Sequence, residues 1–131
     1  MPHPIMFDEN DPLLARVRSI ALTFPGAAEK ISHGRPFFHT KTAFAVYGGS
    51  TKAGGAQFPR SVIVKPAPEE RLALLDEAHT YLPAYLGPSG WMGYDLDRND
   101  LDWTEVGELL DMSFRMTAPA TLVRRLDASV T

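Results

Sequence analysis

The spacing of the β-type segments constrains the fold of this chain more than any other feature. These segments are short, and most connections between them are too short for the crossover of a dozen or more residues that parallel neighbours need. Lys41–Thr42 forms a two-residue turn, and the glycine-rich stretch Gly48–Gly55 is predicted to be a mobile loop. The pattern therefore predicts an antiparallel sheet. Its predicted strands are Phe37–Thr40, Ala43–Tyr47, Gln57–Lys65, Tyr81–Leu86 and Trp91–Leu96.

Four helices are predicted around these strands. Asp11-Pro12 is typical of a helix start, because the Asp carboxylate caps free N–H groups and Pro lacks the N–H that would need a partner. Asp102 and Glu105 resemble a capping box, in which Asp102 accepts a hydrogen bond from the backbone of Glu105. The resulting α+β order is α-β-β-β-α-β-β-α-α, with helices packed on the sheet. The predicted helices run from Pro12 to about Thr23, from Pro68 to about Ala78, from Trp103, and from Pro119.

The length of 131 residues predicts a single domain, 1–131, in which residues 1–10 form a loose N-terminal arm. The chain has no cysteine, which excludes disulfides, thiolate nucleophiles and cysteine-ligated metals, and favours the cytoplasm. The first residues lack the basic and apolar regions of a signal peptide. No segment approaches the roughly 20 apolar residues that span a bilayer, so no membrane association is predicted.

Charge is distributed unevenly along the chain. Residues 1–65 hold eight Lys/Arg against four Asp/Glu, a net +4, and residues 66–131 hold five against twelve, a net −7. The segment Lys30–Lys65 has six basic residues and no acid, which suits contacts with a phosphate backbone. Solvated strand-edge charges are the alternative, and the acidic pI near 5.7 favours it. The candidate nucleic-acid or ligand-binding residues are Lys30, His33, Arg35, Lys41, Lys52, Arg60, Lys65 and Trp91.

Apparent catalytic and metal motifs fail on spacing. Gly49–Lys52 has the wrong residue order for a phosphate loop. Asp95-x-Asp97-x-Asn99 begins like a calcium loop but lacks the later turn glycine and the glutamate ligand, since Asp100 and Val106 stand at those positions. The four histidines form no pair with zinc-ligand spacing, and no serine stands in a nucleophile elbow. We therefore predict no catalytic residue, no metal site and no cofactor.

Several segments carry a family likeness: Glu29–Phe38 followed by Lys41, Phe44 and Ala45; Val64-Lys65 with Pro68–Glu70; Pro83–Trp91; and Glu108–Phe114. In order and spacing, these segments resemble the MmcQ/YjbR family over nearly the whole chain. The resemblance implies a two-layer fold like that of the secretion chaperones, with an antiparallel sheet of about five strands and helices on one face. It also implies a "double-wing" DNA-binding label, without established catalytic residues. The chain departs from the family in its longer, glycine-rich wing at Gly48–Gly55.

Three functions remain open from the sequence. The first is a non-enzymatic module that binds DNA weakly through the backbone, using residues 30–65. The second is a protein-interaction or chaperone-like domain that holds a protein partner, or forms a homodimer, through an exposed sheet face. The third is a small-ligand binder or enzyme whose pocket gathers His33, Arg35, Lys65 and Trp91.

Overall fold

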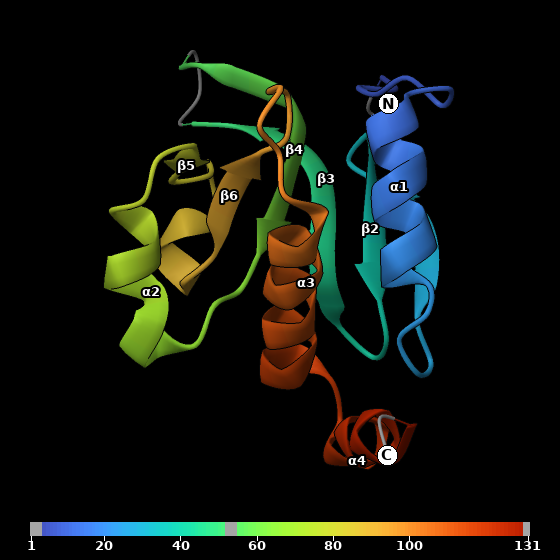
Figure 1. The fold of residues 1–131 in the computed structure, drawn as a ribbon. Coiled ribbons are helices and arrows are strands. Elements are labelled where there is room, and N and C mark those ends of the chain that lie inside the picture. Colours follow the sequence, from blue (N-terminus) through green and yellow to red (C-terminus); the bar gives the residue numbers. More distant parts are fainter. Residues whose placement is uncertain (1–3, 52–54, 130–131) are drawn as a thin grey trace.

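A computed structural model describes residues 4–51 and 55–129. Its six strands form one antiparallel sheet in the order β1-β2-β3-β4-β6-β5. Helices α1 and α3 lie side by side on one face of the sheet, α2 lies beside β5 and β6, and α4 lies at the end of α3 (Figure 1). The elements are α1 (Pro12–Ala21), β1 (Ala28–Ser32), β2 (Arg35–His39), β3 (Ala43–Ser50), β4 (Gln57–Val64), α2 (Pro68–Leu75), β5 (Thr80–Tyr81), a 3₁₀ turn (Gly87–Ser89), β6 (Met92–Asp95), α3 (Trp103–Thr117) and α4 (Ala120–Ser129).

The predicted α+β fold, with an antiparallel sheet, is confirmed. The start of α1 follows from its capping residue, because the carboxylate of Asp11 accepts from the backbone N–H of Leu13 at 2.9 Å. The prediction for Asp102 needs correction, because its carboxylate accepts from the N–H of Thr104 at 2.9 Å rather than from Glu105. A cap residue can reach either the second or the third N–H of a helix, and here it reaches the second.

Three parts of the sheet differ from the prediction. Strand β1 is absent from the predicted strands, because its sequence is mostly polar and its side chains are mostly exposed. The predicted loop begins too early: β3 continues through Gly48 and Gly49 to Ser50, with a register shift where the pairing with β4 skips Gly48. The predicted strand Tyr81–Leu86 holds only at Tyr81, since Pro83 has no N–H to pair and Tyr85 has a positive φ of 66°. Residues 52–54 of the predicted mobile loop lie outside the described residues.

The main core fills the space between the sheet and the helices α1 and α3. Phe24, Phe44 and Phe114 meet there, with ring centroids 5.0 to 5.7 Å apart. Buried residues from every strand except β1 and β5 complete it, including Phe38, Val64 and Tyr94. None of the helices in the described part of the chain is long and apolar enough to cross a membrane.

The opposite side of the sheet, which we call the open face, has a smaller cluster of its own. Val46, Ile63 and Tyr81 are buried there. Four partly buried side chains pack against them: Phe37, Phe58, Leu86 and Trp91. No α-helix of residues 4–51 and 55–129 contributes to this cluster, so a ligand can reach the open face without displacing the main core.

Candidate functional site

Glycines under the open face allow two long side chains to lie flat across the sheet. A Cβ atom on Gly48 would come within 2.4 Å of Nη1 of Arg35, which extends from β2 over β3. A Cβ on Gly93 would come within 2.2 Å of the Tyr81 ring, and one on Gly49 within 2.6 Å of the Tyr81 hydroxyl oxygen. Arg35 and Tyr81 thus approach each other across the open face, Arg35 from β2 and Tyr81 from β5. They lie over glycine positions where any larger residue would collide with them.

A cavity of about 630 Å³ opens on this face beside Arg35. Its walls come from segments far apart in the chain: the N-terminal arm, the β1–β2 turn, strands β2 to β4, and the loop after β5. This size falls within the range of sites for small organic ligands. The lining residues are Met6, His33, Arg35, Phe37, Val46, Gly48, Gly49, Ser50, Ile63, Pro83, Ala84, Tyr85 and Leu86.

Within this cavity, the guanidinium of Arg35 has no anionic partner. Its Nη1 atom is buried, and the group forms no hydrogen bond or ion pair with any described residue. Burial lowers the pKa of Arg35, and the nearby Tyr81 opposes that shift. Arginine nevertheless keeps its proton in proteins. A buried positive charge without a partner is costly, and such a group is a natural place for a bound anion.

Tyr81 does not supply the missing anion. Burial raises the pKa of Tyr81 to about 12, although hydrogen bonding to Ser61 and the charge of Arg35 pull it down. The phenol is therefore neutral at physiological pH. Its oxygen lies 2.7 Å from the Ser61 hydroxyl oxygen, and its ring stacks on Phe58 with centroids 4.1 Å apart. These contacts fix Tyr81 as a rigid neighbour of the charge.

The two loops beside the cavity have unusual backbone conformations. His33 and Gly34 form the β1–β2 turn with φ of 54° and 79°, as the type I′ hairpin turn requires. In the other loop, Tyr85 has φ 66° and the N–H of Leu86 donates to the Ala84 carbonyl at 2.7 Å, which makes a γ-turn around Tyr85. Non-glycine residues with positive φ store strain, and such residues concentrate at ligand sites.

Two of the candidate residues from the sequence meet in this cavity, His33 and Arg35. Lys30 lies on the same face, because it pairs in register with Phe37, and it is exposed on β1. Trp91 packs against the Val46 cluster without lining the cavity. The Lys65 side chain extends past Gly90, beyond the cavity. Lys52 lies outside the described residues.

Arg60 lies on the helix side, in a network that neutralises it. Its guanidinium donates to Asp11 at 3.0 and 3.3 Å and to Asp97 at 3.2 Å. The hydroxyl of Tyr47 also donates to Asp11, at 2.6 Å. Burial tends to raise the pKa of Asp11, but the hydrogen bonds from Arg60, Tyr47 and the Leu13 N–H outweigh it and lower that pKa. Burial and the hydrogen bond to Asp11 raise the pKa of Tyr47.

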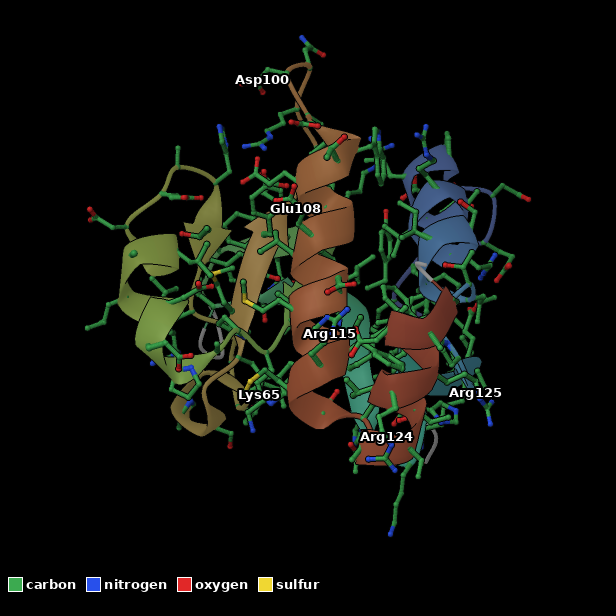
Figure 2. The ribbon with its side chains drawn as sticks, turned by 60° about the horizontal axis from the view of Figure 1, so that its bottom comes forward. Lys65, Asp100, Glu108, Arg115, Arg124 and Arg125 are labelled. Carbon is green, nitrogen blue, oxygen red and sulfur yellow. The ribbon has the colours of Figure 1, made fainter. Side chains whose placement is uncertain are left out.

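Basic residues gather instead at one end of the molecule, where sequence reasoning missed two of them. Figure 2 shows Lys65, Arg124 and Arg125 in the lower part of its view, with Asp100 and Glu108 above. Lys41 is exposed at this end too, since the hydroxyl of the next residue, Thr42, donates to the carbonyl of Thr117 at the end of α3. We call Lys41, Lys65, Arg124 and Arg125 the basic end. None of the four forms an ion pair within the described part of the chain.

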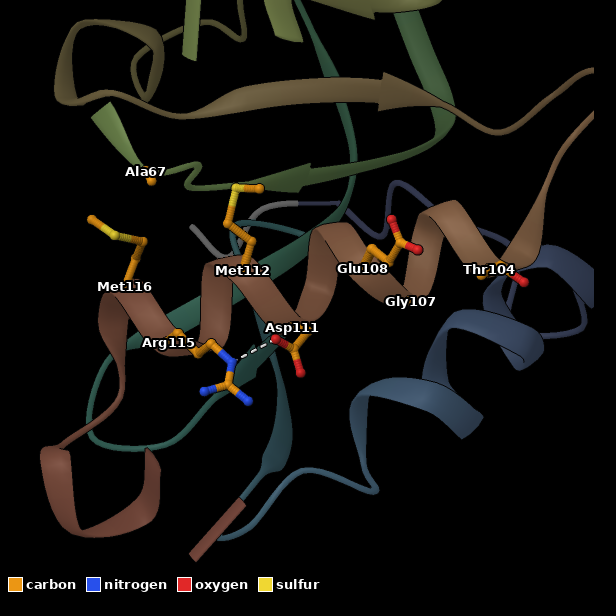
Figure 3. Close-up of a pocket in the computed structure, with 8 residues that line it drawn as sticks. All are labelled: Ala67, Thr104, Gly107, Glu108, Asp111, Met112, Arg115 and Met116. Atoms are coloured by element: carbon orange, nitrogen blue, oxygen red, sulfur yellow. Dashed lines mark hydrogen bonds and ion pairs between the residues drawn. The ribbon is translucent and has the colours of Figure 1, made fainter. Parts of the chain in front are cut away.

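A second hollow of about 570 Å³ lies along the outer side of α3 and lacks the features of the open-face cavity. Met112 and Met116 supply much of its wall (Figure 3). Arg115 and Asp111 point toward each other there and form an ion pair at 2.6 Å. No side-chain atom of the described lining residues is buried without a hydrogen-bond partner. The described lining of this hollow therefore has no buried charge without a partner, unlike Arg35 in the open-face cavity.

Acidic and apolar surface groups add no further site among the described residues. No three His, Asp or Glu side chains of residues 4–51 and 55–129 group together as metal ligands. Asp97 and Asp100 of the partial calcium motif are paired with Arg60 and Arg98. The exposed large apolar residues are spread over different elements, so the protein-partner hypothesis stays a prediction; they include Ile31, Leu72, Leu82 and Met116.

Comparison with known proteins places this site within a family. A search of curated proteins found no match. A family model described as YjbR matches residues 22–116, which include all six strands, helices α2 and nearly all of α3. The matched region contains Arg35, the glycines beneath it and the loop around Tyr85. This chain belongs to the YjbR family.

Proposed function

We propose that this protein is a binding module that takes up a small organic anion in the cavity of its open face. The guanidinium of Arg35 carries the proposal, because its Nη1 is buried without a hydrogen-bond partner among the described residues. An arginine that only stabilised the fold would be paired, as Arg18 is with Glu29 at 2.7 Å and Arg60 is with Asp11. A bound carboxylate or phosphate oxygen would satisfy Nη1 with a charge-assisted hydrogen bond.

Glycine at position 48 supports the same conclusion. Gly48 adopts a positive φ of 84°, and the absence of its side chain leaves the space in which Nη1 of Arg35 lies. The charge is thus held over bare backbone at the side of a cavity, rather than extended into water. Arg71 and Arg98 also have a buried Nε that forms no hydrogen bond with a described residue, but each guanidinium donates to a neighbour through another nitrogen. Of these three arginines, only Arg35 has a guanidinium without any hydrogen bond to a described residue.

The test is an NMR titration of the ¹⁵N-labelled full chain with acetate, benzoate and inorganic phosphate. We expect at least one anion to shift the Nε–Hε signal of Arg35 and the amides of Gly48 and Gly49, with a dissociation constant in roughly the millimolar range or tighter. Arg35→Met should abolish these shifts. Lys30→Met is the matched control, because it removes a cation from the same face outside the cavity. The proposal is refuted if no anion binds, or if Arg35→Met responds like the unmodified protein.

A second candidate function is contact with a nucleic-acid backbone, and the basic end is the observation that favours it. Its four cations are free of ion pairs among the described residues and come from the β2–β3 turn, the end of β4 and helix α4. Phosphate contacts of this kind give affinity with little sequence preference. Two of the residues, Lys41 and Lys65, belong to the acid-free segment 30–65.

Fluorescence anisotropy with duplex and single-stranded DNA, at low and moderate salt, tests this second candidate. We expect Arg124→Ala/Arg125→Ala to lower the slope of log affinity against log salt by about two, whereas Lys30→Ala leaves it unchanged. Affinity weaker than roughly millimolar at low salt, or affinity independent of salt, refutes nucleic-acid binding. This outcome leaves the cavity proposal standing, because Arg35 is not part of the basic end.

A further inference from the structure

From the layout of the cavity, and resting on the proposed function, we infer that its ligand is an amphiphilic monocarboxylate. The carboxylate binds Arg35, and a short linker places an apolar or aromatic body on the row formed by Phe37, Val46 and Ile63. The inference names a ligand class for the site, and it follows from the positions of charge and apolar surface on the sheet.

The strand register sets the distance between the two parts of the ligand. Phe37 pairs with Val46, and Val46 pairs with Ile63, so the three residues form one row across β2, β3 and β4. Arg35 precedes Phe37 by two positions on β2 and therefore points to the same face. Its Nη1 lies at Gly48, two positions after Val46 on β3, and two residues along a strand span about 7 Å. A ligand that reaches both features thus needs an acid group and an apolar group separated by a linker of two or three atoms.

The charge of the cavity selects a monoanion. Among the described residues that line it, Arg35 alone carries a permanent charge, and none is an Asp or Glu. One guanidinium matches one carboxylate, whereas a phosphate dianion would remain undercompensated in this setting. His33 also lines the cavity, from the turn that precedes β2. A neutral ligand would leave Nη1 of Arg35 without an anionic partner. The ligand therefore needs a negative charge in addition to its apolar body.

The loop after β5 supplies the remaining wall of the apolar part. Leu86 packs against the cluster of Val46, Ile63 and Tyr81, while Tyr85 is 86% exposed in its γ-turn beside the cavity. The N–H of Ala84 donates to the Ser50 carbonyl at 2.8 Å, which fixes this loop to the end of β3. An aromatic body on the Phe37 row therefore lies within reach of a tyrosine ring that has no role in the core.

Three probes separate this inference from the proposed function: 3-phenylpropanoate, its neutral amide 3-phenylpropanamide, and acetate. Binding to the full chain is measured by NMR titration, with the methyl signals of Val46 and Ile63 reporting the apolar row. We expect 3-phenylpropanoate to bind at least about tenfold more tightly than acetate, because burial of its ring removes on the order of 100 Å² of apolar surface from water. We expect a similar preference over the amide, because only the carboxylate gives Arg35 a charge-assisted hydrogen bond. Phe37→Ala should reduce that preference over acetate, and Trp91→Phe, on the same face outside the cavity, should keep it.

The possible outcomes distinguish the proposed anion site at Arg35 from the inference that its ligand is an amphiphilic monocarboxylate. If acetate binds as tightly as 3-phenylpropanoate and shifts the Nε–Hε signal of Arg35, the proposed anion site stands and the amphiphilic ligand is wrong. If the amide binds as tightly as the carboxylate, the charge of Arg35 is not used, and both statements fall. If no probe binds at about ten millimolar, both statements fall as well.

Discussion

Replacement of Arg35 by Met gives the sharpest test of the difference between a binding arginine and a structural one. Nη1 of Arg35 is buried without a hydrogen-bond partner in the described part of the chain, so Arg35→Met removes an unsatisfied donor and keeps an unbranched apolar stem. Arg60 is the matched comparison, because its guanidinium bonds Asp11 and Asp97. Arg60→Met makes the same chemical change and leaves the Asp11 carboxylate, which is only 8% exposed, without its cationic partner.

The two substitutions should change stability in opposite directions. A buried unpaired donor costs about 1–3 kcal/mol, and part of this is offset by the contacts that the guanidinium makes, so we expect Arg35→Met to stabilise the fold by about 1 kcal/mol. For a chain of this length, that raises Tm by about 3–5 °C. Breaking a buried pair costs about 3–5 kcal/mol, but Arg60 is 38% exposed and solvent screens it, so we expect a loss of about 1–2 kcal/mol for Arg60→Met.

Urea denaturation followed by tryptophan fluorescence gives both free energies of unfolding, and thermal melts give Tm. The same Arg35→Met protein is then titrated with the anion probes, for which we expect lost binding. Stability gained together with binding lost is the signature of a residue kept for function. If Arg35→Met lowers the free energy of unfolding by about 1 kcal/mol or more, as Arg60→Met does, Arg35 is structural and the reasoning fails.

Three further substitutions test other parts of the structure. Gly48→Ala should cost about 2 kcal/mol by urea denaturation, because φ is 84° and the new Cβ would lie 2.4 Å from Nη1 of Arg35; unchanged stability would contradict that geometry. Asp11→Asn should destabilise the protein by about 1–2 kcal/mol at pH 7. The pKa of Asp11 is lower in the folded than in the unfolded protein, so its stabilising contribution is complete above the unfolded pKa of about 4 and is lost as pH falls through the folded pKa. The unfolding free energies of Asp11→Asn and of the unmodified protein should therefore differ at pH 7 and converge at pH 3. The same difference at both pH values would refute this role of Asp11. Ser113→Ala should lower the stability measured in a thermal melt by about 2 kcal/mol, since the buried hydroxyl donates to the Phe44 carbonyl and accepts from the Lys65 N–H. A loss below about 0.5 kcal/mol would show that these two backbone groups find other partners.

Local signals in the sequence predict the helices and the central strands well. Asp11-Pro12 marks the start of α1 because capping is a property of neighbouring residues. The sequence does not predict strand β1, because an edge strand with mostly exposed polar side chains lacks the alternation of apolar and polar residues that marks a strand. The turn His33-Gly34, whose second residue is glycine, was the available signal for the β1–β2 hairpin.

The cavity could be predicted only in part. His33 and Arg35 are close in sequence, so their joint placement follows from one hairpin turn. The loop from Pro83 to Leu86 joins them only through the tertiary fold, and the glycine-rich stretch gives no local sign that Gly48 underlies a guanidinium. The positions of Lys65 and Trp91 outside the cavity depend likewise on pairing between β4 and β6, which no local pattern specifies.

The attachment of the loop at Ala84 has a consequence for kinetics. Its N–H donates to Ser50, and on the other side the N–H of Met6 donates to Gly34 at 2.9 Å. Both bonds lie outside the strand ladder, so either wall can open while all six strands stay paired. Hydrogen exchange at these two amides therefore measures how often each wall opens, independently of global unfolding. A ligand held between the walls would slow both exchange rates together.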